Sequence, residues 1–208
     1  MNTTRVGILV TLIALVLSPA LRAESMPPAD LVSAAGTIAK EKHQLEVQAA
    51  LRSFAEAPQL EHFFRNSYGC AIFPSIGKGG LGFGGAHGTG WVFEKNNLTG
   101  IVKMTQVTVG YQAGGQAFQQ IVFFEDARAY KAFTSGSFEF AAQASVVALQ
   151  AGAKASVSTE GGGGAGAGNS QSKTRYSDGM AVFTKAKGGL MYEATVGGQK
   201  NKFRPITK

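Results

Sequence analysis

The segment Gly69–Gly85, GCAIFPSIGKGGLGFGG, has the residue types of a phosphate-binding site. An apolar run leads into clustered glycines and Lys78, and Gly80, Gly82 and Gly85 satisfy the G-x-G-x-x-G spacing. That fingerprint binds a dinucleotide only where a helix follows, because the helix N-terminus must face the pyrophosphate. The chain instead continues as GAHGTGWVF, which favours a strand, and glycine replaces the Ser or Thr that follows a Walker lysine. We therefore expect a strand whose glycine-bearing face lets a helix or an aromatic ring approach closely.

Other residues that could carry catalysis are few. His43, His62 and His87 are far apart in sequence and form no compact zinc-binding motif. The chain has no G-x-S-x-G nucleophile elbow, and its single cysteine excludes an intramolecular disulfide. Cys70 lies in an apolar run, where a buried, inert thiol is expected and a reactive thiol is the alternative. We expect no enzyme activity, catalytic residues, metal or cofactor; a hydrolase or redox enzyme would depend on His87 and Cys70.

The positive charge is concentrated near the C-terminus. From residue 173 onward there are eight basic and two acidic residues, whereas residues 24–172 carry ten basic and eleven acidic residues. This asymmetry favours an anionic partner, and the alternative is a solvated basic tail that binds nothing. The residues expected to bind anions are Lys78, Lys185, Lys187, Lys200, Lys202 and Arg204. Aromatic residues accompany them (Tyr176, Phe183, Tyr192 and Phe203), although for Phe183 we favour a place in the core.

The first 23 residues have the layout of a secretory signal peptide. Arg5 is followed by an apolar run over residues 6–17 and by small residues up to Ala23. Cleavage after Ala20 or Ala23 predicts an exported protein, periplasmic or secreted, and an uncleaved anchor is the alternative. Removing residues 1–23 leaves 18 basic and 13 acidic residues, a net charge of +5. Export argues against nucleic acid as the anionic partner.

The remaining chain, 24–208, reads as one α+β domain. Residues 30–66 are predicted to be helical, with a long helix over 30–57 and a shorter one beginning at Pro58. The long helix carries two apolar stripes on nearly opposite faces, so either it breaks near Gln44 or its later part is covered on both sides. Residues 69–205 predict mostly antiparallel strands in a barrel-like sheet, interrupted by a short helix that Asp126 caps and by a flexible glycine-rich loop at 160–172.

Several shorter stretches predict individual strands of this sheet. WVFEKNNLTGIVKM predicts a hairpin that turns at Asn96-Asn97, and TQVTVGYQAGG and FQQIVFF predict two further strands. The segment 69–83 also recurs at 179–192, where Lys187-Gly188-Gly189-Leu190 repeats Lys78-Gly79-Gly80-Leu81. We interpret each copy as a hairpin of one antiparallel sheet, with a glycine supplying the positive φ of the turn.

Three segments resemble successive blocks of the SYLF domain: SYGCAIFPSIGKGGLGFGGAHGTGWVF, TVGYQAGGQAFQQIVFF and YSDGMAVFTKAKGGLMYEATVGG. The resemblance covers residues 49–203 and implies an α+β domain on antiparallel strands that binds anionic phospholipids. Some eukaryotic members also bind actin, and their lipid binding involves a basic amphipathic N-terminal helix. Here residues 30–57 are balanced in charge, and export removes the chain from cytoplasmic phosphoinositides and actin. Lipid binding is therefore expected as a class without a defined head group, and actin binding is not expected.

These observations lead to one expected function and one alternative. We expect a non-enzymatic exported protein of the cell envelope that binds anionic phospholipid, or another anionic envelope surface, through its basic C-terminal region. The alternative is a structural or adhesive module that binds an envelope protein and has no lipid preference.

Overall fold

A computed structural model describes residues 29–140, 146–149 and 175–206 of the chain. Its elements, in chain order, are α1 (Ala29–Ala35), α2 (Glu41–Ala55), the 3₁₀ turn η1 (Pro58–Leu60), α3 (Glu61–Asn66), β1 (Gly69–Glu94), β2 (Asn97–Phe124), α4 (Ala127–Thr134), β3 (Ser137–Phe140), β4 (Val146–Leu149) and β5 (Met180–Pro205). The predicted α+β class is confirmed, with helices before the sheet and one between strands. The expected signal peptide (1–23) and glycine-rich loop (160–172) lie outside the described residues.

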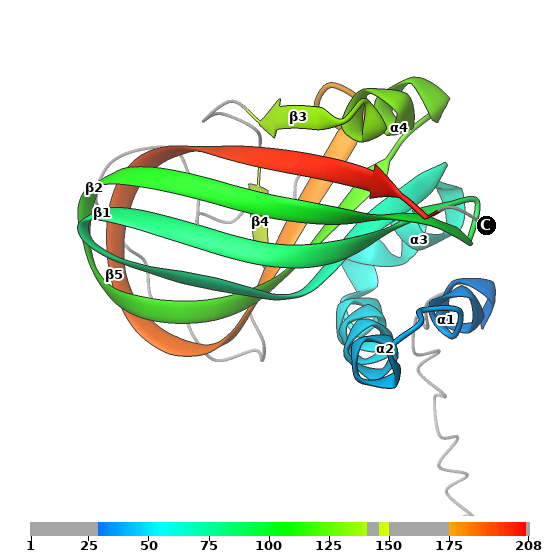
Figure 1. Cartoon of the computed structure of the whole chain (residues 1–208), viewed down its shortest axis with the longest axis horizontal. Helices are drawn as coiled ribbons and strands as arrows, with labels where there is room; N and C mark the ends of the chain where they lie inside the picture. The colour runs from blue at the N-terminus through cyan, green and yellow to red at the C-terminus, as the bar shows by residue number, and fades with distance from the viewer. Residues whose placement is uncertain (1–28, 141–145, 150–174, 207–208) are drawn as a thin grey trace, which may run out of the picture.

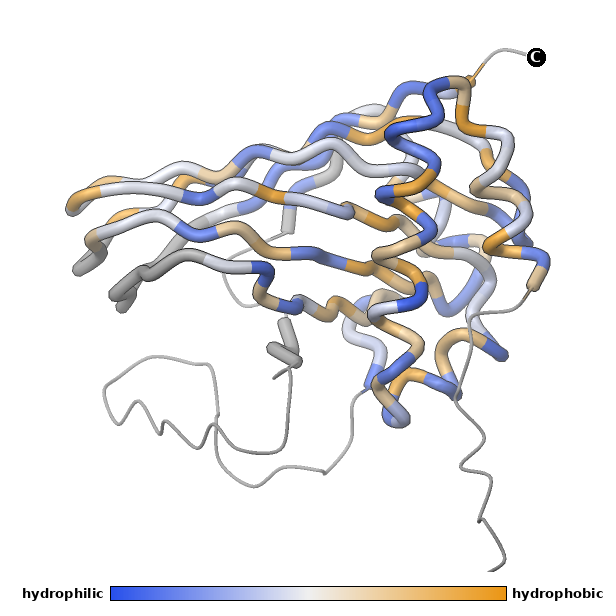
Figure 2. Tube along the Cα trace, turned by 90° about the horizontal axis from the view of Figure 1, so that it is seen from below, coloured by the Kyte–Doolittle hydropathy of each residue, from blue (hydrophilic) through white to orange (hydrophobic). Residues whose placement is uncertain are grey.

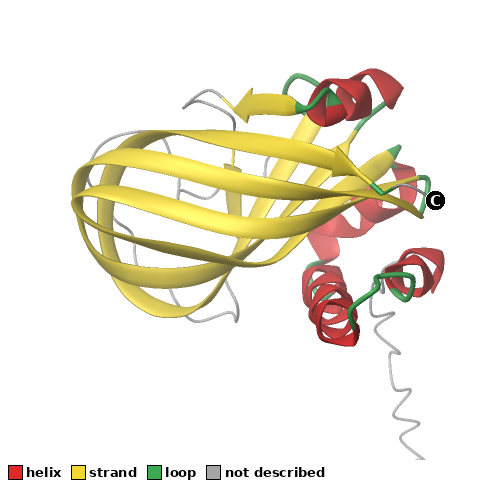
Figure 3. Ribbon diagram, in the orientation of Figure 1, coloured by secondary structure: helices red, strands yellow, loops and turns green. Residues whose placement is uncertain are grey.

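Three long strands dominate an open, mostly antiparallel sheet (Figure 3). The hydrogen-bonded order is β1-β2-β5-β3, and β4 pairs with β5 in parallel. β1 and β2 are joined by a two-residue turn at Lys95 and Asn96, both with positive φ, one residue earlier than predicted. TQVTVGYQAGG and FQQIVFF are parts of the single strand β2.

The three long strands turn back on themselves halfway along their length (Figure 1). The turning point in β1 is Gly82, whose φ of 69° favours glycine. Leu81 pairs with Ala113 and Phe83 pairs with Val109. One residue of β1 therefore lies opposite three residues of β2, so β2 follows a wider path around this point. We call residues 79–86 of β1, 106–115 of β2 and 190–199 of β5 the bend.

The two lysine–diglycine segments are not hairpin turns, and that prediction is wrong. Both lie inside continuous strands on either side of β2, where Gly79 pairs with Gly115 and Gly188 pairs with Ala117. The prediction that both segments belong to one antiparallel sheet is confirmed, and what differs is the role of the glycines. Residues without side chains let a paired strand curve sharply without leaving the sheet.

The glycines of β1 also let its two halves approach each other closely. A Cβ at Gly90 would lie 2.7 Å from Cδ1 of Phe73, and a Cβ at Gly88 would lie 2.6 Å from Cγ1 of Ile76. The ring therefore lies against Gly90 and not against Gly80 or Gly82, where a close approach was predicted. Gly80 instead faces the backbone of Phe83 and Gly84.

Folding the sheet creates two apolar layers. The face between the two halves of the sheet, which we call the inner face, buries a cluster that includes Phe73, Val102 and Val122. The opposite, outer face is covered at the end away from the bend by α1, α2 and α3, which bury a second cluster with it. The rest of the outer face, toward the bend, carries exposed side chains.

The N-terminal helices begin and end at different residues from those predicted. The expected helix over 30–57 is divided into α1 and α2 by a break at residues 36–40, earlier than Gln44. Consequently only one face of α2 is buried, by Val47, Leu51 and Phe54, while Leu45 is 58% exposed. The predicted cap of α4 is confirmed, because the backbone N–H of Ala129 donates to Oδ1 of Asp126 at 2.8 Å.

We predict that Gly90→Ala destabilises the fold by about 1–3 kcal/mol, because the new methyl group overlaps the Phe73 ring and the carbonyl oxygen of Ile72. Urea unfolding followed by circular dichroism measures this change. Gly77→Ala is the matched control, since no heavy atom lies within 4 Å of its Cβ position. Equal stability of the two variants would contradict the close packing of the two halves of β1.

Candidate anion-binding surface

The six predicted basic residues do not form one cluster. Lys200, Lys202 and Arg204 alternate along the second half of β5, on its outer face. Lys78, Lys185 and Lys187 belong to the first halves of β1 and β5, across the bend. The sheet therefore divides the predicted set into two groups of three.

The group that contains Lys185 makes contacts within the fold. Lys185 is largely buried, with 16% of its side chain exposed, and its Nζ donates to the carbonyl oxygen of Ser53 at 3.0 Å and to Glu56 at 3.1 Å. A cation at the C-terminal end of α2 donates to carbonyls that have no partner within the helix, and it interacts favourably with the negative end of the helix dipole. Lys187 Nζ donates to the carbonyl oxygen of Pro74 at 3.1 Å, and Lys78 is half-buried. These contacts connect β5 to α2 and to β1.

The second group lies on an open surface and includes a residue that the sequence analysis missed. Lys103 of β2 pairs directly with Lys202 of β5, so both side chains project from the outer face. Their neighbours Val102, Met104 and Asn201 face inward and are fully buried. We call Lys103, Lys200, Lys202 and Arg204 the basic face.

The basic face carries an excess of positive charge. All four side chains are exposed. Lys200 forms an ion pair with Glu139 of β3 at 2.9 Å, and the other three have no ion pair with any residue that the structure describes. Three uncompensated cations on one exposed strand surface can contact several anionic groups at once, as the head groups of a membrane present them.

The sequence does not predict Lys103 as an anion-binding residue, because Lys103 lies in the part of the chain that is balanced in charge. Its alternation with buried neighbours was visible as a strand pattern. The register that places it opposite Lys202 depends on two segments separated by about a hundred residues. Only the fold brings these residues together.

The aromatic residues of the basic C-terminal region that the structure describes pack mainly in the interior. Phe183 is fully buried, as predicted, with its ring 5.1 Å from that of Phe63. Tyr176 also contacts Phe63, and burial raises its pKa to about 12. Phe203 is half-buried against Gly100. The side chain of Tyr192 lies outside the described residues.

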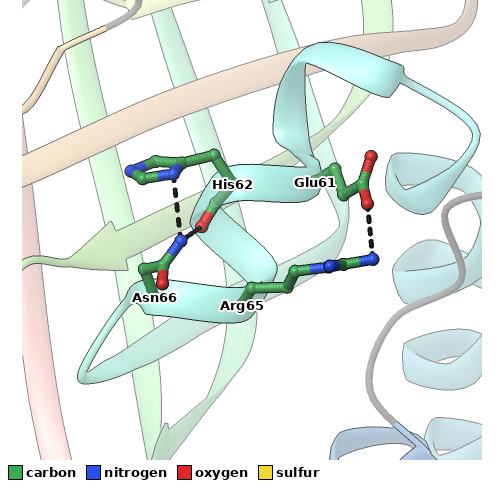
Figure 4. Close-up of polar contacts among 4 residues, drawn as sticks. All are labelled: Glu61, His62, Arg65 and Asn66. Carbon is green, nitrogen blue, oxygen red and sulfur yellow. Dashed lines mark hydrogen bonds and ion pairs between the residues drawn. The ribbon is translucent and has the colours of Figure 1, made fainter.

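The three histidines remain separate in the fold. The imidazole of His43 lies 5.1 Å from the ring of the buried Trp91. His62 lies on α3, where Asn66 Nδ2 is 2.9 Å from its Nδ1 (Figure 4). His87 is exposed on the outer face of β1. Within the ranges that the structure describes, no three His, Cys, Asp or Glu side chains gather as metal ligands would.

Cys70 is buried in β1, where 3% of the residue is exposed. Burial raises the pKa of its thiol to about 12, because the charged thiolate would be desolvated. The thiolate is the nucleophilic form, so the folded protein holds this sulfur in its unreactive state at neutral pH.

No helix among the described residues is long and apolar enough to cross a bilayer. The longest of them, α2, has 15 residues and buries only one face.

We predict that Cys70 of the native protein does not react with a thiol reagent such as Ellman's reagent at pH 8, and reacts fully in urea. The folded pKa of about 12 exceeds the ordinary thiol value, so ionisation favours the unfolded chain as pH rises above about 9. Burial of the neutral thiol therefore costs no stability at neutral pH, and the free energy of unfolding falls between about pH 9 and 12. Rapid labelling of the folded protein would instead support the redox alternative.

Comparison with known proteins gives one distant similarity. No protein-family model matches the chain, and no solved structure matches it. A curated protein of Aeromonas veronii, Beta cell expansion factor A, is 28% identical over 153 residues, which is 73% of this chain and 52% of that protein. The chain thus spans about half the length of the curated relative that it matches.

Proposed function

We propose that this protein is a non-enzymatic, exported component of the cell envelope that binds anionic phospholipid surfaces through its basic face. The observation that carries the proposal is the direct pairing of Lys103 with Lys202 on an uncovered strand surface, with Arg204 two residues further along β5. Like charges directly opposite each other destabilise a sheet. An anionic surface would attract both lysines and so offset their mutual repulsion.

Two features of the sequence support the same proposal. The signal-like residues 1–23 favour export, where bacterial membranes offer anionic lipid surfaces. The resemblance to the SYLF domain favours lipid as the anionic partner, and we infer that the chain contains such a domain. Each basic residue near an anionic membrane contributes about 1 kcal/mol, so three unpaired cations give on the order of a hundredfold in affinity.

The structure changes which residues we assign to this function. Lys103 joins Lys200, Lys202 and Arg204, whereas Lys185 and Lys187 are assigned to contacts within the fold. Lys78 faces the inner side of the sheet, as do its neighbours Ile76 and Gly80 along the strand. The proposed contact surface is therefore one face of β2 and β5 rather than the whole C-terminal segment.

We predict that the triple variant Lys103→Glu, Lys202→Glu, Arg204→Glu loses binding to anionic vesicles by a factor on the order of one hundred or more. The measurement is co-sedimentation with vesicles of phosphatidylglycerol and phosphatidylcholine, compared with phosphatidylcholine alone. Reversing both paired lysines keeps a like-charge pair, so the sheet is not selectively weakened or strengthened at that position.

The matched control is the triple variant Lys40→Glu, Lys42→Glu, Lys131→Glu. It changes the net charge equally, at exposed positions just before α2, in α2 and in α4. We expect it, and Lys185→Met, to bind nearly as the wild type does. Equal losses in both triple variants would indicate dependence on net charge alone. Equal binding of the wild type to anionic and neutral vesicles would refute the proposal and favour the alternative of a protein-binding module without lipid preference.

We also predict that Lys103→Glu alone stabilises the fold while weakening vesicle binding. It replaces a repulsive cross-strand pair by an attractive one, for a gain of about 0.2–1 kcal/mol at low salt. Urea unfolding at low and at high salt measures the gain and its screening. A loss of stability would show that the Lys103–Lys202 repulsion is not significant.

A further inference from the structure

The bend lies at the end of the molecule opposite the helices (Figure 1), and Figure 2 shows hydrophobic residues along its backbone. Leu81 is 82% exposed, Phe83 75%, Val107 61% and Val109 51%. The register pairs Phe83 with Val109, and Val107 follows Thr105 and Lys103 on the same side of β2. The apolar residues therefore continue the outer face of the sheet directly from the basic face.

At the bend the usual distribution of polar and apolar residues in a sheet is inverted. Thr108, between the exposed Val107 and Val109, is 2% exposed and faces inward. Gln106 and Gln199 are also half-buried, whereas the apolar side chains of Leu81, Phe83, Val107 and Val109 face solvent. Apolar residues outside and polar residues inside are typical of strands whose outer surface contacts lipid.

Charged residues are nearly absent from the bend and begin at its borders. Its three segments contain one charged residue, Glu193, and no lysine or arginine. The nearest charged residue in β1 is Lys78, and in β2 it is Lys103. In β5, Lys187 and Lys200 lie on the two sides of the bend. An uncharged apolar end bordered by lysines matches the order in which a membrane presents acyl chains and anionic head groups.

We propose that the bend inserts Leu81, Phe83, Val107 and Val109 into the acyl region of an anionic bilayer while the basic face contacts the head groups. This inference rests on the proposed binding to anionic phospholipid and adds the part of the fold that enters the membrane. A second copy of the chain is the other occupant to consider. The charge pattern favours the bilayer, because a second copy would bring its own lysines against those that border the bend.

Phe83→Trp tests the insertion, because it places an indole on the bend. The protein used is the chain from residue 24 to residue 208. The only native tryptophan, Trp91, is 4% exposed and provides a constant background. With phosphatidylglycerol-containing vesicles, we expect the introduced indole to emit at shorter wavelength and to be quenched by lipids brominated along the acyl chain. Leu45→Trp is the matched control, since Leu45 is 58% exposed on α2, and it should show neither change.

A serine pair separates insertion from surface attachment. We expect Leu81→Ser with Phe83→Ser to lose at least tenfold in affinity for anionic vesicles, because apolar transfer to the acyl region is lost. Leu45→Ser should bind as the wild type does. Urea unfolding of each variant verifies that the fold is retained, as we expect for substitutions at exposed positions.

The possible outcomes distinguish this inference from the proposed function. If the protein sediments with anionic vesicles but the indole is neither shifted nor quenched, insertion is refuted and head-group binding stands. If the indole is quenched while reversal of the basic face has no effect, insertion stands and the electrostatic proposal fails. A wild-type dimer that the serine pair converts to a monomer, without change in vesicle binding, would identify a second copy as the occupant and overturn the inference.

Discussion

The close approach of the two halves of β1 is the constraint on which the rest of this structure depends. Gly88 and Gly90 leave room for Ile76 and the Phe73 ring, and Gly82 reverses the direction of the strand. Because β2 and β5 remain paired with β1 and with each other, all three strands must turn together. One sheet thereby provides both sides of the inner layer. Its outer face is left to the helices at one end and to solvent at the other.

This arrangement explains why neighbouring residues of one strand have such different roles. Toward the helices, both faces of the sheet are apolar and covered, as with Phe123 and Val122 of β2. Further along the same strand, Lys103 is exposed while Val102 and Met104 are buried. At the bend the apolar valines are outside and Thr108 is inside. The surface thus changes from helix-covered to basic to apolar along a single direction.

The sequence was sufficient for local features and insufficient for those that depend on distant pairing. The Asp126 cap, the buried Phe183 and the strand after the glycine cluster follow from short-range patterns, and the structure confirms them. Glycine suits a hairpin and a curved strand equally, so the sequence of the lysine–diglycine segments does not distinguish the two. Period-two alternation through Val107 and Val109 identifies a strand, but it cannot tell which face meets solvent. The position of Lys103 opposite Lys202 required the register.

The order of the strands also has a consequence for how the chain folds. β1 and β2 are consecutive, so their pairing involves a two-residue turn and can form early. Phe124 at the end of β2 pairs with Met180, and residues 125–179 must be synthesised before β5 begins. Until then the far edge of β2 offers unpaired amides and carbonyls over its whole length, which favours aggregation. Synthesis of the chain therefore passes through an interval in which the 28-residue strand β2 can pair with another chain along its free edge.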